Sequence, residues 1–76
     1  MDVRIGISES NQVIEVEMAD ETDRAALKSS ISDSISEGTV LWLIDKRGKE
    51  TGIPGAKVAF ADIGSAADGR RIGFGA

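Results

Sequence analysis

The chain contains no cysteine, no histidine and no tyrosine among its 76 residues. Disulfide bonds are therefore excluded, and so are metal sites built from thiolate or imidazole ligands. The commonest general bases and nucleophiles of enzymes are missing with these residues. An enzyme or a magnesium site would have to rely on carboxylates alone. The acids gather in EVEMADETD, where strand alternation and the start of a helix already account for them. We therefore expect a protein that is not an enzyme and that holds neither a metal ion nor another cofactor.

Long hydrophobic runs are also absent. The longest, VLWLI at residues 40–44, has five residues, whereas a membrane-spanning helix needs about 20. The first ten residues, MDVRIGISES, show no basic region followed by an apolar stretch, so we expect no signal peptide. These absences predict a soluble, cytoplasmic protein.

The length predicts one small domain over residues 1–76. Such a chain buries only roughly 60–65% of the surface that it exposes when unfolded, which leaves a stability margin of a few kcal/mol. Because disulfides and thiolate or imidazole metal sites are excluded, either a small, well-packed hydrophobic core or a subunit interface must supply that margin. We favour a homodimer, because it would also hide the apolar Trp42 side of the strand expected over residues 40–45.

Charge is distributed unevenly along the chain. Residues 1–45 hold ten acidic and three basic side chains, net −7, and residues 46–76 hold three acidic and six basic ones, net +3, which sums to −4. The overall sign argues against general binding of nucleic acid. The basic half either keeps turns and edge strands soluble or binds an anionic ligand.

The first half of the chain predicts two strands and a helix. Apolar residues alternate with polar or small ones over residues 3–7 and 14–18, which is typical of a half-buried hairpin. The period then changes to four, which predicts a helix ending at Gly38, with Asp20 or Thr22 as its N-terminal cap. The expected apolar stripe of this helix is Leu27, Ile31 and Ile35.

The second half predicts strands only. Residues 40–45 are apolar on both faces and indicate a central strand, with Leu41 and Leu43 on one side and Val40, Trp42 and Ile44 on the other. A turn at DKRGKE follows, then strands over 51–53 and 57–63, with a break at Pro54–Gly55. In the strand over 57–63, Val58 and Phe60 are expected to share one face.

The predicted fold class is α+β, a ββα unit followed by three or four strands, with a mainly antiparallel sheet and one helix packed on one face. A single helix leaves the Trp42 side of its strand uncovered. Curling into a partial barrel or dimerisation would hide that side. Trp42→Ala should cost about 3–5 kcal/mol if Trp42 is in the core, and should dissociate a folded chain if Trp42 lies at an interface.

The chain ends on GRRIGFGA, which is rich in glycine and arginine. A phosphate-binding loop needs a following helix, and none follows here, so we expect a closing strand. Its nearly bare face, with Gly73 and Gly75, allows close approach of a subunit or a ligand. Together with Phe74 and Trp42, these glycines are the candidate interface residues.

Paired arginines suit the forked recognition of phosphate or carboxylate. Lys57, Arg70 and Arg71 are therefore the candidate residues for an anionic ligand. The alternative is that Arg70 or Arg71 forms a salt bridge with Asp62 on the neighbouring strand.

Four stretches resemble a family of short, uncharacterised actinobacterial proteins: VRIGI, GTVLWLIDKRGK, IPGAKVAFADIG and RRIGFG. The resemblance spans nearly the whole chain. It implies a cytoplasmic protein with a ββα-then-sheet layout, and some members carry an automatic ATP-binding label. The positions that match the family pattern are Pro54, Lys57, Asp62, Gly64, Arg70, Arg71, Gly73, Phe74 and Gly75.

Two functions follow as hypotheses. The first is a small non-catalytic interaction or regulatory module that acts through self-association or a protein partner, without membrane or nucleic-acid binding. The second is a regulator that binds a nucleotide such as ATP, or another phosphorylated metabolite, through the basic carboxyl-terminal half.

Overall fold

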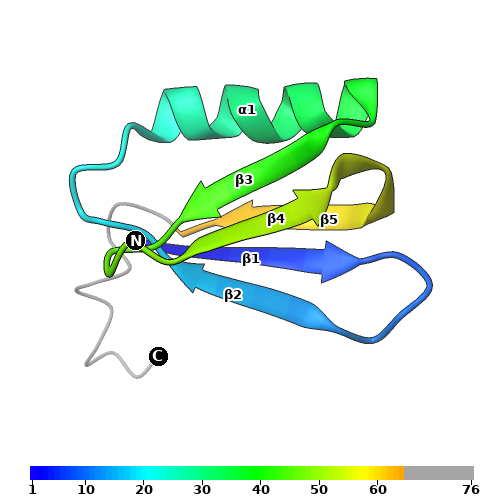
Figure 1. Cartoon of the computed structure of the whole chain (residues 1–76), viewed down its shortest axis with the longest axis horizontal. Helices are drawn as coiled ribbons and strands as arrows, with labels where there is room; N and C mark the ends of the chain where they lie inside the picture. The colour runs from blue at the N-terminus through cyan, green and yellow to red at the C-terminus, as the bar shows by residue number, and fades with distance from the viewer. Residues whose placement is uncertain (65–76) are drawn as a thin grey trace.

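The computed structural model describes residues 1–64 and shows one helix lying on antiparallel strands (Figure 1), which confirms the α+β class and the ββα start. The expected closing strand, with Arg70, Arg71, Gly73, Phe74 and Gly75, lies outside the described residues. In chain order the elements are β1 (Asp2–Ile7), β2 (Val13–Glu17), α1 (Arg24–Glu37), β3 (Val40–Ile44), β4 (Glu50–Pro54), the 3-10 helix η1 (Gly55–Lys57) and β5 (Val58–Ile63).

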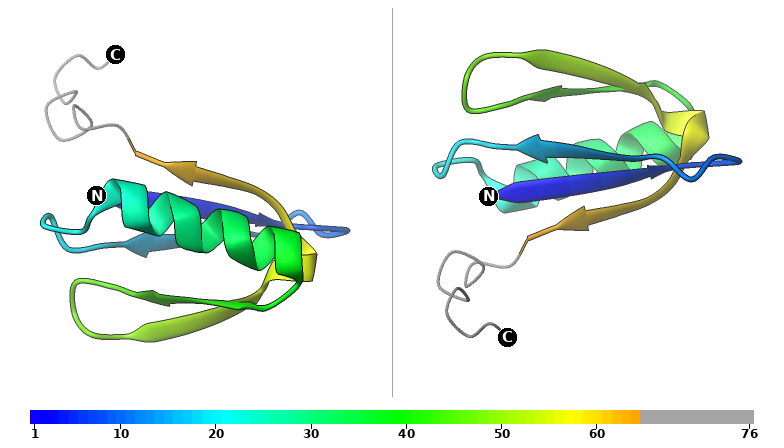
Figure 2. Two further views of the ribbon diagram at one scale, coloured as in Figure 1. Left: turned by 90° about the horizontal axis from the view of Figure 1, so that it is seen from above. Right: turned by 90° about the horizontal axis from the view of Figure 1, so that it is seen from below.

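The described strands form two antiparallel sheets. One has the order β2-β1-β5, and the other is the β3–β4 hairpin. Both views of Figure 2 place β3 between β4 and β2, and a hydrogen bond from Lys46 N–H to the Glu17 carbonyl (2.9 Å) joins these neighbours at one end. Within residues 1–64, β3 pairs only with β4, so the prediction of a central strand was wrong.

Helix α1 is capped three residues after Asp20 and one residue after Thr22, the two caps that the sequence predicts. The Thr22 N–H donates to the Ala19 carbonyl (3.0 Å), which uses residues 19–22 in a turn. Asp23 is therefore the cap, and its side chain accepts a hydrogen bond from the Ala26 N–H (3.1 Å). The helix ends at Gly38, as predicted, because that residue adopts the left-handed conformation at φ 73°.

The buried stripe of α1 also differs from the expected one. Leu27 and Ile31 are buried, but the third buried residue is Ser34, and Ile35 is 44% exposed. The backbone of Gly55 lies against Ser34 at the last turn of the helix and covers it. At this end of the helix, the contact between Ser34 and the backbone of Gly55 thus takes the place that the four-residue period predicts for the side chain of Ile35.

One hydrophobic core lies between α1 and the inner faces of the strands. Ile5, Leu41 and Leu43 are among its most completely buried side chains. The alternation predicted for residues 3–7, 14–18 and 40–44 is confirmed, since every second residue enters this core. Its members are Val3, Ile5, Val16, Met18, Leu27, Ile31, Leu41, Leu43 and Ile53.

Strand β5 contains an irregularity that the sequence did not predict. Phe60 pairs with Gly6 and Val58 with Ile7, so Ala59 is one residue too many for its partner strand. Such a bulge interrupts the alternation of faces. Val58 consequently packs against the core while Phe60 is exposed, and the expected sharing of one face by Val58 and Phe60 was wrong.

The β3–β4 turn is closed by one carboxylate. Asp45 accepts hydrogen bonds on Oδ1 from the N–H groups of Arg47 (2.8 Å) and Lys49 (2.9 Å). The Lys49 N–H is the main cause that holds the pKa of Asp45 below its ordinary value. Partial loss of water opposes this, while the Arg47 N–H and the charges of Lys49 and Arg47 add to the lowering of the pKa.

We expect Asp45 to make the stability depend on pH. A carboxyl whose folded pKa is lowered stabilises the fold above its unfolded pKa of about 3.9, and this is lost as the pH falls through the folded pKa. The difference in melting temperature between the native chain and Asp45→Asn should therefore be largest near neutral pH and should shrink below about pH 4. A difference that stays constant from pH 7 to pH 2 would contradict this origin.

In the described part of the chain, no helix combines the length and the apolar character that crossing a bilayer requires.

Candidate interaction surface

The outer face of the β3–β4 hairpin carries an exposed apolar row. Strand alternation sends Leu41 and Leu43 into the core, so the three residues between and beside them point outward. Val40 is 50% exposed, Trp42 64% and Ile44 53%. These three residues, with Pro54 opposite Val40 and Gly52 opposite Trp42, form what we call the Trp42 row.

Trp42 is held flat against its neighbouring strand. A Cβ atom added at Gly52 would lie 2.8 Å from the indole atoms Cη2 and Cζ3, so the ring occupies the space that a side chain would fill. The absence of a side chain at position 52 thus permits the ring to rest on the backbone of β4. One face of the indole is covered and the remainder is open to a partner.

A second exposed aromatic repeats this arrangement on the other sheet. Phe60 of β5 lies over Gly6 of β1, where an added Cβ would meet the ring within 2.7 Å. Phe60 is 44% exposed, and Val13, opposite Gly6 on its other side, is 40% exposed. We call these three residues the Phe60 row.

Charged residues occupy the remaining outward positions. Arg4 lies opposite Glu15 on β2 and opposite Asp62 on β5, and its Nε is 3.7 Å from the Glu15 carboxylate. The cross-strand neighbour of Asp62 is therefore Arg4, a cation that the sequence did not predict as its partner. The expected partners, Arg70 and Arg71, lie outside the described residues. The acids of this outer face are Asp2, Glu15, Glu17, Glu50 and Asp62.

The lysines of the basic half are spread over both ends of the molecule. Lys46 and Lys49 belong to the β3–β4 turn, which lies at the end where the chain begins, whereas Lys57 lies in η1 at the opposite end (Figure 1). The Lys46 ammonium is 3.2 Å from the Glu17 carboxylate. Among residues 1–64, Lys57 is thus the one described member of the expected anion site, and no second lysine of this half lies beside it at that end.

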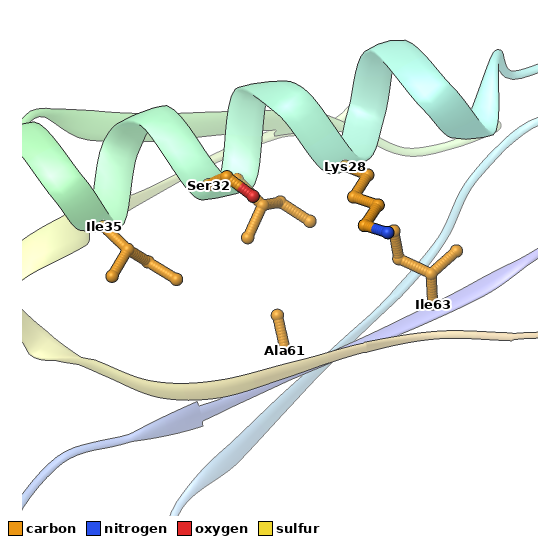
Figure 3. A pocket seen from close by; sticks show the side chains of 6 residues that line it. Lys28, Ser32, Ile35, Ala61 and Ile63 are labelled. Atoms are coloured by element: carbon orange, nitrogen blue, oxygen red, sulfur yellow. The ribbon is translucent and has the colours of Figure 1, made fainter.

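A shallow hollow of about 220 Å³ lies between α1 and β5 (Figure 3). Its walls are apolar, and Lys28 and Ser32 stand on its helical side. The exposure of Ile35 is explained by this hollow, since the side chain borders it without being covered. The lining residues are Lys28, Ile31, Ser32, Ile35, Ala61 and Ile63.

Of the interface residues predicted from sequence, the structure describes only Trp42, and it lies on an exposed face and not in the core. Sequence reasoning missed the Phe60 row and the acidic character of the face around it. The signal available was a glycine inside each strand pattern, Gly6 and Gly52, because such glycines mark a close approach of another group. Which aromatic ring covers which glycine depends on the register between strands.

The chain matches a known family model over nearly its whole length. Residues 1–75 fit the sequence profile of a family described as "Protein of unknown function (DUF3107)". The match covers nearly the whole chain, which confirms the resemblance to an uncharacterised family. No curated protein matches the chain.

Proposed function

We propose that this chain, which belongs to the DUF3107 family of proteins of unknown function, is a small non-catalytic interaction module that binds another protein chain through the outer face of its strands. The observation that carries the proposal is Trp42, which is 64% exposed and fixed in orientation over Gly52. Tryptophan is enriched among the few residues that dominate binding energy at protein interfaces. A ring that is already immobilised loses little conformational entropy on binding.

The shape of the surface supports a macromolecular partner. The Trp42 row lies on the open face of a hairpin, and the hollow beside α1 is lined by other residues. Small ligands are usually enclosed in a concave pocket, whereas proteins bind across open faces with an apolar centre and a polar rim. The residue inventory of the whole chain, without histidine, cysteine or tyrosine, supports a role without catalysis.

Two kinds of partner fit this proposal, namely a second copy of the chain and a different protein. A homodimer would bring two Trp42 rows together around a twofold axis. A different protein would present its own apolar group to the indole. Native mass spectrometry of the gently purified chain distinguishes them, because it counts the subunits and weighs whatever is attached.

Trp42→Ala is expected to weaken partner binding at least tenfold while the chain stays folded. The loss follows from removing the exposed ring, and the cost to stability should be only about 1–2 kcal/mol because just the covered part of the ring contributes to folding. The sequence-based alternative of about 3–5 kcal/mol for a core tryptophan does not apply to a residue that is 64% exposed.

The measurement is site-specific photo-cross-linking in an extract of the host. A cross-linking residue at position 44 is compared with one at Ser36, which lies exposed on α1. Cross-links from position 44 should saturate and should be competed by the unlabelled native chain but not by unlabelled Trp42→Ala. Equal competition by both chains would exclude the Trp42 row as the contact surface.

The alternative function, binding of a nucleotide or another phosphorylated metabolite, would use Lys57, Arg70 and Arg71. Its support is the net charge of +3 over residues 46–76 (three acidic and six basic side chains). It predicts stabilisation by about 2.7 kcal/mol when the ligand is present at a hundredfold excess over its dissociation constant. Thermal unfolding with ATP and with inorganic phosphate therefore tests it directly, with Lys57→Gln as the variant that should lose the effect.

A further inference from the structure

The outer face of the strands is acidic. Counted over residues 1–64, it presents five carboxylates, and its cations are Arg4 and, at the end of β3, Lys46. Glu15 and Glu17 have these cations within 4 Å, at 3.7 and 3.2 Å. For Asp2, Glu50 and Asp62, no ion pair of that length occurs within residues 1–64. The described residues therefore give this face a net negative charge beside its apolar rows.

This charge bears on what covers the face. Two copies packed face to face would bring equal sets of carboxylates together, and like charges across an interface cost binding energy. Nucleic acid and polyphosphates are disfavoured for the same reason. A positively charged partner, in contrast, gains attraction at the rim and is steered toward the surface as it approaches.

The order of the strands distributes apolar and acidic positions across the face. Moving from β3 to β5 (Figure 2), the surface presents the Trp42 row, then Val13, Glu15 and Glu17 of β2, then Arg4 and Gly6 of β1, and finally Phe60 and Asp62 of β5. Carboxylates of β2, β4 and β5 thus lie beside the apolar positions of the Trp42 and Phe60 rows. The open side of the Trp42 indole also accepts a cation, since the face of the ring is electron-rich.

We propose that this face binds a basic segment of a different protein, in which lysine or arginine side chains lie between apolar ones. The apolar side chains contact the Trp42 and Phe60 rows, and the basic ones lie over the carboxylates of β2, Asp62 and Glu50. The inference rests on the proposed function, because it names the chemistry of the partner for the same surface.

Trp42 provides the readout, because it is the one tryptophan of the chain. The full chain is titrated with a twelve-residue peptide, free of tryptophan, that alternates leucine or phenylalanine with lysine or arginine. The indole emission should change saturably. A peptide with glutamate in place of every basic residue should leave the emission unchanged, and a higher salt concentration should weaken binding of the basic peptide.

A matched pair of charge variants tests the face itself. Glu50→Gln with Asp62→Asn removes two outer carboxylates, and Asp33→Asn with Glu37→Gln removes two exposed ones from α1, so the net charge changes equally. The first variant should bind the basic peptide about five- to tenfold more weakly, and the second should stay within about twofold of the native chain. If the two variants weakened binding equally, the net charge of the chain would explain the attraction without this face, and the proposal would be overturned.

Two other occupants would also overturn it. The chain alone is diluted while its molecular mass and its indole emission are measured. If the emission changes over the same concentrations at which a dimer dissociates, a second copy covers the face. If Arg70→Gln with Arg71→Gln raises the affinity for the basic peptide more than about fivefold, whereas Arg24→Gln with Lys28→Gln, which changes the net charge equally, does not, the chain's own residues 65–76 compete for the face.

The proposed function and this inference fail in different ways. Should the cross-links from position 44 be specific while the captured partner is acidic or the charge variants have no effect, only the basic nature of the partner is excluded. Should Trp42→Ala compete as well as the native chain, the interaction surface itself is excluded.

Discussion

Leu41→Ala is expected to lower the free energy of unfolding by about 2–5 kcal/mol. Leu41 is 2% exposed and lies in the core beneath α1, so truncation removes buried methyl groups and leaves a cavity. For a domain of this size, whose margin is a few kcal/mol, that loss leaves a large unfolded population at 37 °C. Urea unfolding followed by far-ultraviolet circular dichroism measures it.

Ile44→Ala is the matched control, since Ile44 lies on the same strand but is 53% exposed on the outer face. Its truncation should cost no more than about 1–1.5 kcal/mol, because about half of the side chain is already in water. The two variants thus separate the faces of β3 energetically. If Ile44→Ala were as destabilising as Leu41→Ala, the hairpin would have to pack on the core through both faces.

The alternation over residues 40–44 explains why so much of this strand was predictable. A period of two assigns alternate residues to opposite faces whatever the strand's neighbours are. It does not say which face is covered when both are apolar. The prediction therefore separated Leu41 from Trp42 correctly, while the exposure of Trp42 depends on where the single helix lies.

The differences in β5 and α1 share another cause. Ala59 forms a bulge because two residues of β1 face three of β5, and this mismatch is a property of the pair of strands. Ser34 is buried because a backbone segment some twenty residues later lies against it. Neither contact leaves a trace in the local periodicity from which faces were predicted.

Which residues become neighbours on the candidate surface depends even more on the register between strands. Glu15 and Glu17 were predicted to lie on the polar face of a hairpin, but their neighbourhood with Arg4, Asp62 and Phe60 follows from β5 pairing beside β1. The charge profile along the chain placed positive charge in the second half. Folding brings acids from both halves onto one face, so the linear profile is a poor guide to the surface.

Gly55→Ala is expected to destabilise the domain by about 1–3 kcal/mol or more, because steric overlap with backbone cannot be relieved by a rotamer change. Gly55 is buried at the start of η1, and its N–H donates to the Thr39 carbonyl (2.8 Å). A Cβ atom there would meet the Ser34 carbonyl group and would lie 2.7 Å from the Thr39 oxygen.

This position ties the last turn of α1 to the crossing from β4 to β5. Forcing Gly55 away from Ser34 breaks the hydrogen bond to Thr39, exposes the buried serine and shifts the start of β5. The loss should therefore appear as a lower melting temperature and as faster amide hydrogen exchange in β5.

Gly38→Ala is the control, because it also replaces a glycine next to the end of α1 but meets no atom within 4 Å. Its cost comes only from the left-handed backbone at φ 73° and should be about 1 kcal/mol. Gly55→Ala should exceed it and should be accompanied by faster exchange in β5, whereas Gly38→Ala should accelerate exchange at the helix end alone. The reverse order would mean that the chain accommodates a side chain at position 55 by moving η1, and that the contact with Ser34 does not determine how β5 reaches β1.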